Sequence, residues 1–402
     1  MEIATLPDHN PTINPLQQEN TKPDTDPKHR PKLINETRLL RQFEQDIAVA
    51  GLVGEEENAK VVFLSAVSAK LQKPLNVSVS GESSAGKNHL TGCVAKFIPD
   101  EGKKILTGMS AKVLMHSDEH EYEHKAVFIA EYEGVSGADY AIRTMQSEQV
   151  IEWEFVDSSN SGIQKKKCTV RGPAAFIQAT TRVTLHPENE TRLLFVRIDE
   201  SEEQTKAINE QQAWEAAEGA SRRPEDLVES WHELLRSFTA TQVRIPFAPQ
   251  LARHFPPDHV RSRRDFPKLL SLIEAIAYLH QDHRTRDKEG RIIAAPQDYL
   301  DAKGLFEHCY SAGPEVAVGK MLEVLGAPGS EFSVADLMSK TGWKKTKAYE
   351  MVGRAEELGC IAEGEGRGRY KLLRAHSDPP LALPDKLWLT ARDFRISAGL
   401  PS

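Results

Sequence analysis

Hydrophobic and polar positions divide the chain into a polar, proline-rich start, a long middle part with regular apolar patterns, and a polar end. Residues 1–31 contain six prolines and few large apolar side chains, too few to offset the entropy lost on ordering. We therefore expect a disordered arm over residues 1–33. After this arm, apolar residues recur at helical spacing, which predicts two amphipathic helices before residue 75.

Short apolar runs in the middle part predict buried strands. Each run is bounded by polar or turn residues, and the runs alternate with helical stretches, as in a mostly parallel sheet covered on both faces. The runs occupy residues 75–79, 126–130, 174–179 and 193–198. Residues 150–155 and 167–170 flank the polar stretch DSSNSGIQ and predict a β-hairpin inserted before the third run. An α/β core over residues 34–205 is expected.

Helical patterns dominate after residue 205, and FPKLLSLIEAIAYLHQ is the most regular of them. We expect a helical lid over residues 206–312. A tail punctuated by prolines, residues 376–402, is expected to be loosely held.

The region between the lid and the tail, residues 313–375, shows the element order of a small winged-helix domain. Ser333 is a candidate N-cap for a short helix, and a second helix is predicted over residues 344–358 after a turn at Gly342. A strand predicted over residues 370–373 would close a Gly-rich hairpin, the wing.

A glycine-rich loop follows the strand predicted at residues 75–79 and precedes a helix predicted at residues 89–97. Its pattern is G-x-x-x-x-G-K, in which successive backbone N–H groups can wrap around phosphates while the lysine adds a positive charge. The expected nucleotide-binding residues are Gly81, Glu82, Ser83, Ser84, Ala85, Gly86, Lys87 and Asn88. The order strand, loop, helix predicts binding of a nucleoside triphosphate, and a glycine-rich turn without a ligand is the alternative.

Metal coordination depends on the residue after the lysine, which is usually Ser or Thr and binds Mg²⁺ through its hydroxyl. Here it is Asn88, whose amide oxygen can coordinate the ion directly or through water. A second acidic site is expected where residues 126–130 end, at Glu131 and Glu133, which alternation in an extended chain places on one side. ATP and Mg²⁺ are the expected ligands, with Asn88 and Glu131 at the metal, and a solvated acidic strand end is the alternative for the glutamates.

Several motifs in the same order resemble the AAA+ helicase-like ATPase module found with primases of phages and mobile elements. The resemblance spans about residues 60–310 and rests on LNVSVSGESSAGKNHL, AVFIAEYEG, AAFIQATTR and HPENETRLLFVRIDES. It implies a P-loop NTPase fold of the AAA+ type. In that family the module accompanies a CHC2 zinc finger and a toprim primase domain, and neither is recognisable here. The resemblance therefore implies a stand-alone motor or loader subunit, with a separate primase as a candidate partner. Minichromosome-maintenance helicases are more distantly similar, because they share the inserted hairpin and a C-terminal winged helix.

The resemblance also implies roles by position for residues around the loop. Lys87 corresponds to the phosphate lysine, Glu131 to the acid on the metal side, and Glu133 to a group that polarises water. Thr180 or Thr181, at the end of the AAFIQA run, corresponds to the polar sensor of the terminal phosphate.

Two positions of the resemblance imply arginines that bind or stabilise the phosphates. Arg192 corresponds to the arginine finger that ring-forming relatives insert into the site of a neighbouring subunit. Arg263 or Arg264 corresponds to the second sensor in the helical lid. A homo-oligomeric ring is the implied assembly, and ordinary surface salt bridges are the alternative for these arginines.

Basic residues of the predicted hairpin indicate contact with nucleic acid. Lys165, Lys166 and Lys167 lie on one arm, opposite Trp153 and Phe155 on the other. In a ring such a hairpin could follow a phosphate backbone, with aromatic stacking. A solvated hairpin tip is the alternative.

The C-terminal region is basic although the whole chain has a net charge of −8. Residues 340–374 contain nine basic and five acidic residues. Side chains at the start of the second helix could enter a groove, and arginines of the wing could bind phosphates. The expected DNA contacts are Lys344, Lys345, Lys347, Arg367 and Arg369. Docking to another protein is the alternative.

The sequence allows three function classes, of which the third explains the fewest features. The first is a nucleic-acid-stimulated motor ATPase, a DNA helicase or replication-initiation factor of a phage or mobile element. The second is a nucleotide-binding DNA regulator or replication accessory protein with little hydrolysis, which Asn88 favours. A small-molecule kinase does not explain the hairpin or the C-terminal region. The sequence has no apolar run long enough to span a bilayer and no secretory signal pattern, and its four scattered cysteines form no paired ligand spacing, so a cytoplasmic protein with reduced thiols is expected.

Overall fold

A computed structural model describes most of the chain. The described residues are 33, 36–132, 137–159, 162–182, 185, 187–218, 225–239, 241–257, 261–366, 368–375, 383–385, 387 and 398. The arm expected at residues 1–33, apart from Leu33, and most of the expected tail lie outside the described residues.

A five-stranded parallel sheet forms the centre of the molecule, in the order β2-β3-β6-β1-β7. Its strands are β1 (Val77–Ser80), β2 (Lys103–Leu106), β3 (Lys125–Ile129), β6 (Ala174–Thr180) and β7 (Leu194–Arg197). The four predicted strands are confirmed. The fifth, β2, was not predicted because it is an edge strand whose first two residues are Lys103 and Lys104 and whose Ile105 is 60% exposed.

Helices cover both faces of this sheet, so its alternate side chains enter two different cores. Val77 and Val79 face a core that also contains helices α1 (Leu39–Val49), α2 (Glu56–Ser68) and α3 (Lys87–Lys96). Phe176 and Phe195 face a second core with helices α4 (Ala111–Met115) and α5 (Asp139–Glu148). Strands buried on both faces explain why they read as continuous apolar runs.

Helices after residue 205 share the first core rather than forming a separate unit. Trp231 packs edge-on against Phe43 and Phe63, with ring centroids 5.7 and 5.3 Å away, and its indole N–H donates to the Asp46 carboxylate at 2.8 Å. These helices are α8 (Glu225–Ser237), α9 (Ala248–His254), α10 (Ser262–Leu279) and α11 (Pro296–Ser311), and they follow α7 (Glu202–Glu218) in the chain. The boundary expected at residue 205 therefore does not divide the hydrophobic core, because these aromatic rings join both sides of it.

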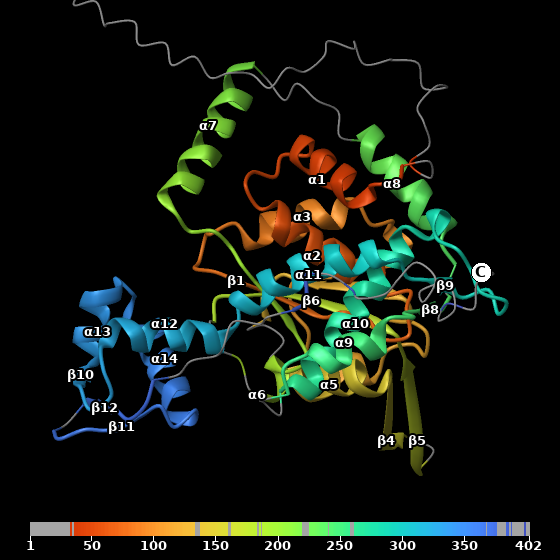
Figure 1. Ribbon diagram of the computed structural model, residues 1–402. Coiled ribbons are helices and arrows are strands. Elements are labelled where there is room, and N and C mark those ends of the chain that lie inside the picture. The colour runs from red at the N-terminus through yellow and green to blue at the C-terminus, as the bar shows by residue number, and fades with distance from the viewer. Residues whose placement is uncertain are drawn as a thin grey trace, which may run out of the picture.

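Two further elements extend from this body (Figure 1). The hairpin of β4 (Val150–Ser159) and β5 (Gly162–Arg171) projects beyond the helices, with longer arms than the sequence predicted. Helix α7 projects at the top of the same view, and most of its side chains after Gln204 are exposed.

The C-terminal elements form a small unit with its own core at the left of Figure 1. They are α12 (Pro314–Leu325), β10 (Glu331–Ser333), α13 (Val334–Thr341), α14 (Lys345–Glu357), β11 (Ile361–Glu363) and β12 (Arg369–Leu372). The predicted cap is present, since the Ser333 hydroxyl accepts from the Asp336 N–H and the Asp336 carboxylate accepts from the Ser333 N–H. Gly342, with φ of 70°, ends α13 in the left-handed conformation.

Short elements complete the description. They are α6 (Pro187–Glu190), the two-residue strands β8 (Val243–Arg244) and β9 (Ile292–Ile293), and the 3₁₀ turns η2 (Asp100–Gly102) and η4 (Gln281–His283). Within the described ranges, every helix is too short or too polar to cross a lipid bilayer.

Candidate functional site

The glycine-rich loop joins the carboxyl end of β1 to the amino end of α3. Two of its residues have positive φ, Ser84 at 68° and Gly86 at 97°, and Gly86 is the N-cap of α3. This left-handed backbone turns the chain sharply, so that the amides of the loop and of the first helical turn can point at one ligand. The predicted strand, loop and helix are thus present.

Lys87 bends back over this loop. Its ammonium donates to the carbonyl oxygens of Gly81 at 2.8 Å and Glu82 at 2.6 Å. The charge therefore lies inside the turn, where it favours an anion.

Glu200 supports the loop from the end of the neighbouring strand. Its carboxylate accepts from the Glu82 N–H at 2.5 Å, and a Cβ added to Gly81 would lie only 3.3 Å from the same oxygen. Glycine at position 81 therefore permits this close approach. Sequence reasoning missed Glu200, although the acidic residues after residues 193–198 were a usable signal.

Strand register brings the expected acid and sensor to the same edge of the sheet as the loop. Ser80 is the partner of Thr180, and Ile129 is the partner of Gln178. Continuing this register places Glu131 beside Thr180. Since β6 separates β3 from β1 and neighbouring strands lie about 4.8 Å apart, Glu131 stands about 10 Å to the side of the loop strand.

The two threonines at the end of β6 have different environments. Thr180 is 1% exposed, and its hydroxyl accepts from the Arg182 N–H at 3.0 Å. Thr181 is exposed at the same edge of the sheet. Thr181 is therefore the more accessible of the two threonines.

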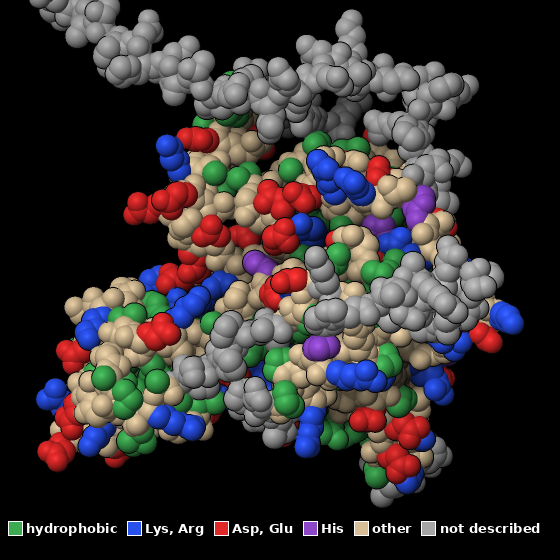
Figure 2. All heavy atoms as spheres, viewed as in Figure 1, with side chains coloured by type: hydrophobic (Ala, Val, Ile, Leu, Met, Phe, Trp, Pro, Cys, Tyr) green, Lys and Arg blue, Asp and Glu red, His purple; other side chains and the backbone are tan. Residues whose placement is uncertain are grey.

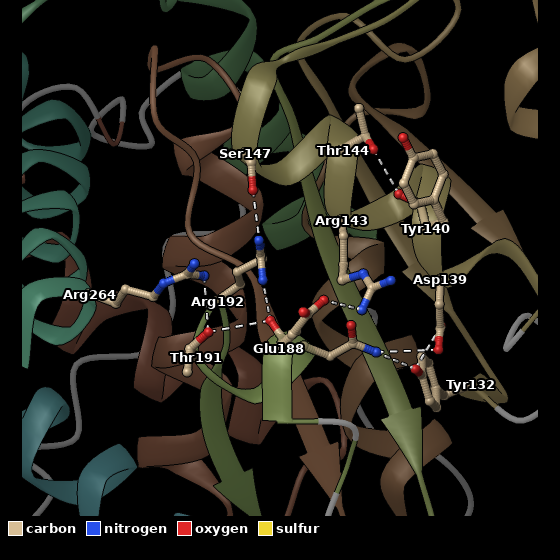
Figure 3. Close-up of polar contacts among 11 residues, drawn as sticks. Tyr132, Asp139, Tyr140, Arg143, Thr144, Ser147, Glu188, Thr191, Arg192 and Arg264 are labelled. Carbon is tan, nitrogen blue, oxygen red and sulfur yellow. Dashed lines mark hydrogen bonds and ion pairs between the residues drawn. The ribbon is translucent and has the colours of Figure 1, made fainter. Parts of the chain in front are cut away.

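Tyr132 anchors the segment that carries the acids. Its hydroxyl donates to the Asp139 carboxylate at 2.6 Å and accepts from the Asn189 amide at 2.8 Å (Figure 3). Burial raises the pKa of Tyr132, so the phenol stays protonated. Glu131, immediately before it, is exposed. Glu133 lies outside the described residues.

Asn88 lies exposed in the first turn of α3. Together with Glu131 it is the residue that could hold Mg²⁺, which typically keeps several waters and takes one or two protein oxygens plus phosphate. Among the described residues there is no group of three or more His, Cys, Asp or Glu side chains suited to a metal. The available donors fit an ion that is bound mainly by nucleotide phosphates.

Arg192 and Arg264 lie together in a cluster of polar contacts (Figure 3). The Arg192 guanidinium donates to the Ser147 hydroxyl at 2.9 Å and to the Glu188 carbonyl. The Arg264 guanidinium donates to the Thr191 hydroxyl at 3.0 Å. Burial lowers the pKa of Arg192, and repulsion by the neighbouring Arg264 lowers it further.

This arginine cluster and the glycine-rich loop lie at opposite edges of the sheet. Arg192 precedes β7, whose first residue, Leu194, donates its N–H to the carbonyl of Asn76, just before β1. The loop follows the other end of β1. The expected contact of Arg264 with a nucleotide bound to the same chain is therefore not supported, because the Thr191 contact holds Arg264 at the far edge. Arg263 is exposed nearby.

Of the residues expected to bind DNA in the C-terminal region, one contacts the glycine-rich loop. The Lys344 ammonium pairs with the Glu82 carboxylate at 2.6 Å. Lys345 and Arg369 are exposed, with Lys345 5.9 Å from the ring centroid of Tyr349. Arg367 lies outside the described residues.

Acidic partners accompany the hairpin lysines. Lys165 pairs with Glu154 at 2.5 Å and Lys167 with Glu152 at 2.7 Å, across the two strands. Trp153 is 38% exposed. The hairpin surface is thus mixed in charge rather than uniformly basic.

Comparison with known families agrees with this geometry. Residues 38–237 match the family described as the MTBMA_p00010 P-loop domain. The match runs from the residue before α1 to the end of α8 and includes the whole parallel sheet. A comparison with curated proteins finds no similar sequence. The chain therefore carries a P-loop domain, which indicates a nucleotide-binding NTPase module.

Proposed function

Because residues 38–237 form a P-loop domain, we propose that the protein is a motor ATPase stimulated by nucleic acid. It binds ATP with Mg²⁺, acts as a homo-oligomeric ring, and serves as a DNA helicase or replication-initiation factor of a phage or mobile element. The observation that carries this proposal is the alignment of the loop, Thr181 and Glu131 along one edge of the parallel sheet.

Each group at this edge has a chemical role in the proposal. The loop amides and Lys87 bind the phosphates, and Asn88 and Glu131 hold the magnesium ion and its waters. Thr181 contacts the terminal phosphate. Arg192, at the opposite edge, serves the site of the next subunit, where its charge stabilises the phosphoryl group in the transition state.

The contact with DNA is assigned to the projecting hairpin and the C-terminal elements. The hairpin extends clear of the body, as a strand-tracking element requires, and carries an exposed tryptophan among its lysines. The order α13, turn, α14, hairpin supports a winged helix.

ATP turnover in the presence of Mg²⁺, measured with and without single-stranded DNA, tests this proposal. We expect DNA-stimulated hydrolysis that Lys87→Ala removes. Lys96→Ala, which changes an exposed lysine at the other end of α3, is the matched control and should leave turnover intact. Absence of turnover under both conditions would refute the enzymatic proposal.

A second candidate is a DNA-binding regulator that uses nucleotide as a switch with little hydrolysis. Asn88 in place of a hydroxyl and the contact between Lys344 and the loop favour it. Tight ATP binding without turnover, together with a sequence-specific DNA footprint, would select this candidate.

A further inference from the structure

A buried cluster of charges docks the C-terminal elements onto the parallel-sheet domain. The Arg354 guanidinium, on α14, pairs with Glu190 at 2.7 Å, and Arg261 pairs with Glu315, on α12, at 2.7 Å. The side chains of Arg354 and Glu190 are 8% and 2% exposed. Such a buried network requires well-matched geometry, because any charge left unpaired is strongly unfavourable. The network therefore fixes the position of α14.

Helix α14 therefore spans from this cluster to the glycine-rich loop. Its 13 residues give a length of about 20 Å at 1.5 Å per residue. Arg354 lies near the carboxyl end of α14. Lys344, the N-cap of the helix, contacts Glu82 of the loop. Figure 2 shows Lys and Arg side chains where the C-terminal elements, at the left, meet the rest of the molecule.

Lys347 lies in the first turn of α14, at the same end of the helix as Lys344. It lies close to Arg197, Glu200 and Glu82. Arg197 ends β7 and is level with Ser80, the last residue before the loop. Burial lowers the pKa of Lys347, and the charge of Arg197 lowers it further. Two half-buried cations thus stand together beside the loop.

Neither cation forms a close ion pair with a described carboxylate. In the part of the chain that the structure describes, the side chains of Arg197 and Lys347 make no ion pair, and Lys347 rests 5.2 Å from the centroid of the Trp343 ring. The carboxylates of Glu200, Glu82 and Glu350 act on Lys347 from a greater distance. Two of them are engaged elsewhere, since Glu82 pairs with Lys344 and Glu200 accepts from the Glu82 N–H. Two like charges that are partly removed from water are unfavourable unless an anion lies between them.

We propose that Lys347 and Arg197 bind the terminal phosphates of a nucleotide held in the glycine-rich loop of the same chain. This inference rests on the proposed nucleotide binding and adds the C-terminal elements to the site. Lys347 supplies one positive charge from α14. Arg197 supplies another from the end of β7. The first turn of α14 thereby senses whether the nucleotide carries a third phosphate.

Affinity for a non-hydrolysable ATP analogue and for ADP, measured without DNA, tests the proposal. We expect Lys347→Met to weaken binding of the triphosphate about 10-fold, as for loss of one charge-assisted hydrogen bond, and binding of ADP much less. Lys347→Arg should retain most of the affinity. Lys320→Met, which removes an exposed lysine on α12 of the same C-terminal unit, is the matched control and should leave both affinities unchanged.

Arg197→Met provides an independent variant on β7. It should also weaken binding of the triphosphate much more than binding of ADP. Equal losses for both nucleotides, or no loss in either variant, would overturn the role in binding the terminal phosphate. If the unmodified protein binds neither nucleotide, the proposed function itself fails, so the two failures are distinguishable.

Discussion

The two edges of the parallel sheet carry different chemistry. The carboxyl edge has the glycine-rich loop, Glu131 and Thr181, a set that can hold a nucleotide and a metal. The amino edge has Arg192 and Arg264, held by Ser147 and neighbouring groups. In the proposed function, each edge supplies part of what phosphoryl transfer requires.

This difference means that Arg192 cannot reach the glycine-rich loop of its own chain, so the proposed role of Arg192 requires a second subunit. The sheet itself separates the two edges, and no rotamer change of an arginine side chain spans it. A head-to-tail ring solves the problem, because it brings the amino edge of one subunit to the carboxyl edge of the next. The proposed mechanism therefore predicts activity that depends on assembly.

The largest effect is expected from the amino edge. Arg192→Ala should lower turnover about 100-fold or more, while nucleotide binding stays close to normal, because the lost charge acts only on the transition state. Steady-state ATP hydrolysis and equilibrium binding measure the two quantities. Arg253→Ala, at an exposed position on α9, is the control. A normal rate in Arg192→Ala would remove the amino edge from the mechanism.

The carboxyl edge should respond differently to loss of its acid. We expect Glu131→Gln to lower turnover about 100-fold and also to weaken the dependence of binding on Mg²⁺, because the metal loses a ligand. Titration with Mg²⁺ at fixed ATP measures this. Glu233→Gln, on the exposed side of α8, is the matched control. If Glu131→Gln keeps full turnover, another acid serves this edge.

Changes in the hairpin should alter the stimulation of turnover by DNA but not the turnover measured without DNA. Replacing Lys165, Lys166 and Lys167 with alanine should reduce the stimulation about 10-fold and lower the salt dependence of DNA binding, while turnover without DNA is retained. Glu152→Gln with Glu154→Gln should have the opposite effect, because it frees the paired lysines. Unchanged DNA binding in both variants would contradict a role for the hairpin.

The smallest change is expected at Asn88. Asn88→Thr introduces the hydroxyl that usually binds Mg²⁺ and should lower the Mg²⁺ concentration for half-maximal turnover by a factor of roughly three. An unchanged Mg²⁺ requirement would show that position 88 does not contact the ion.

Much of the carboxyl edge could be predicted because it is encoded locally. The apolar runs predict the buried strands, and the loop pattern lies within eight consecutive residues. The partners across the structure could not be predicted. Glu200 is 118 residues from the amide it accepts from, and Glu190 is 164 residues from Arg354. Strand β2 was missed because its side chains are largely polar or exposed. The hydrophobic core that continues past residue 205 was missed because it depends on Trp231 packing against rings that are distant in sequence.

Mixing two inactive variants tests the central claim, that the two edges act together across a subunit boundary. Lys87→Ala keeps its arginine, and Arg192→Ala keeps its loop, so a mixed ring contains interfaces with both. In an equal mixture roughly a quarter of head-to-tail interfaces should be complete, and turnover should rise well above the sum of the separate variants. Mixing Lys87→Ala with the Lys87→Ala, Arg192→Ala double variant is the control and should restore nothing. Mixed rings, confirmed by mass, that show no turnover above that sum would contradict the account.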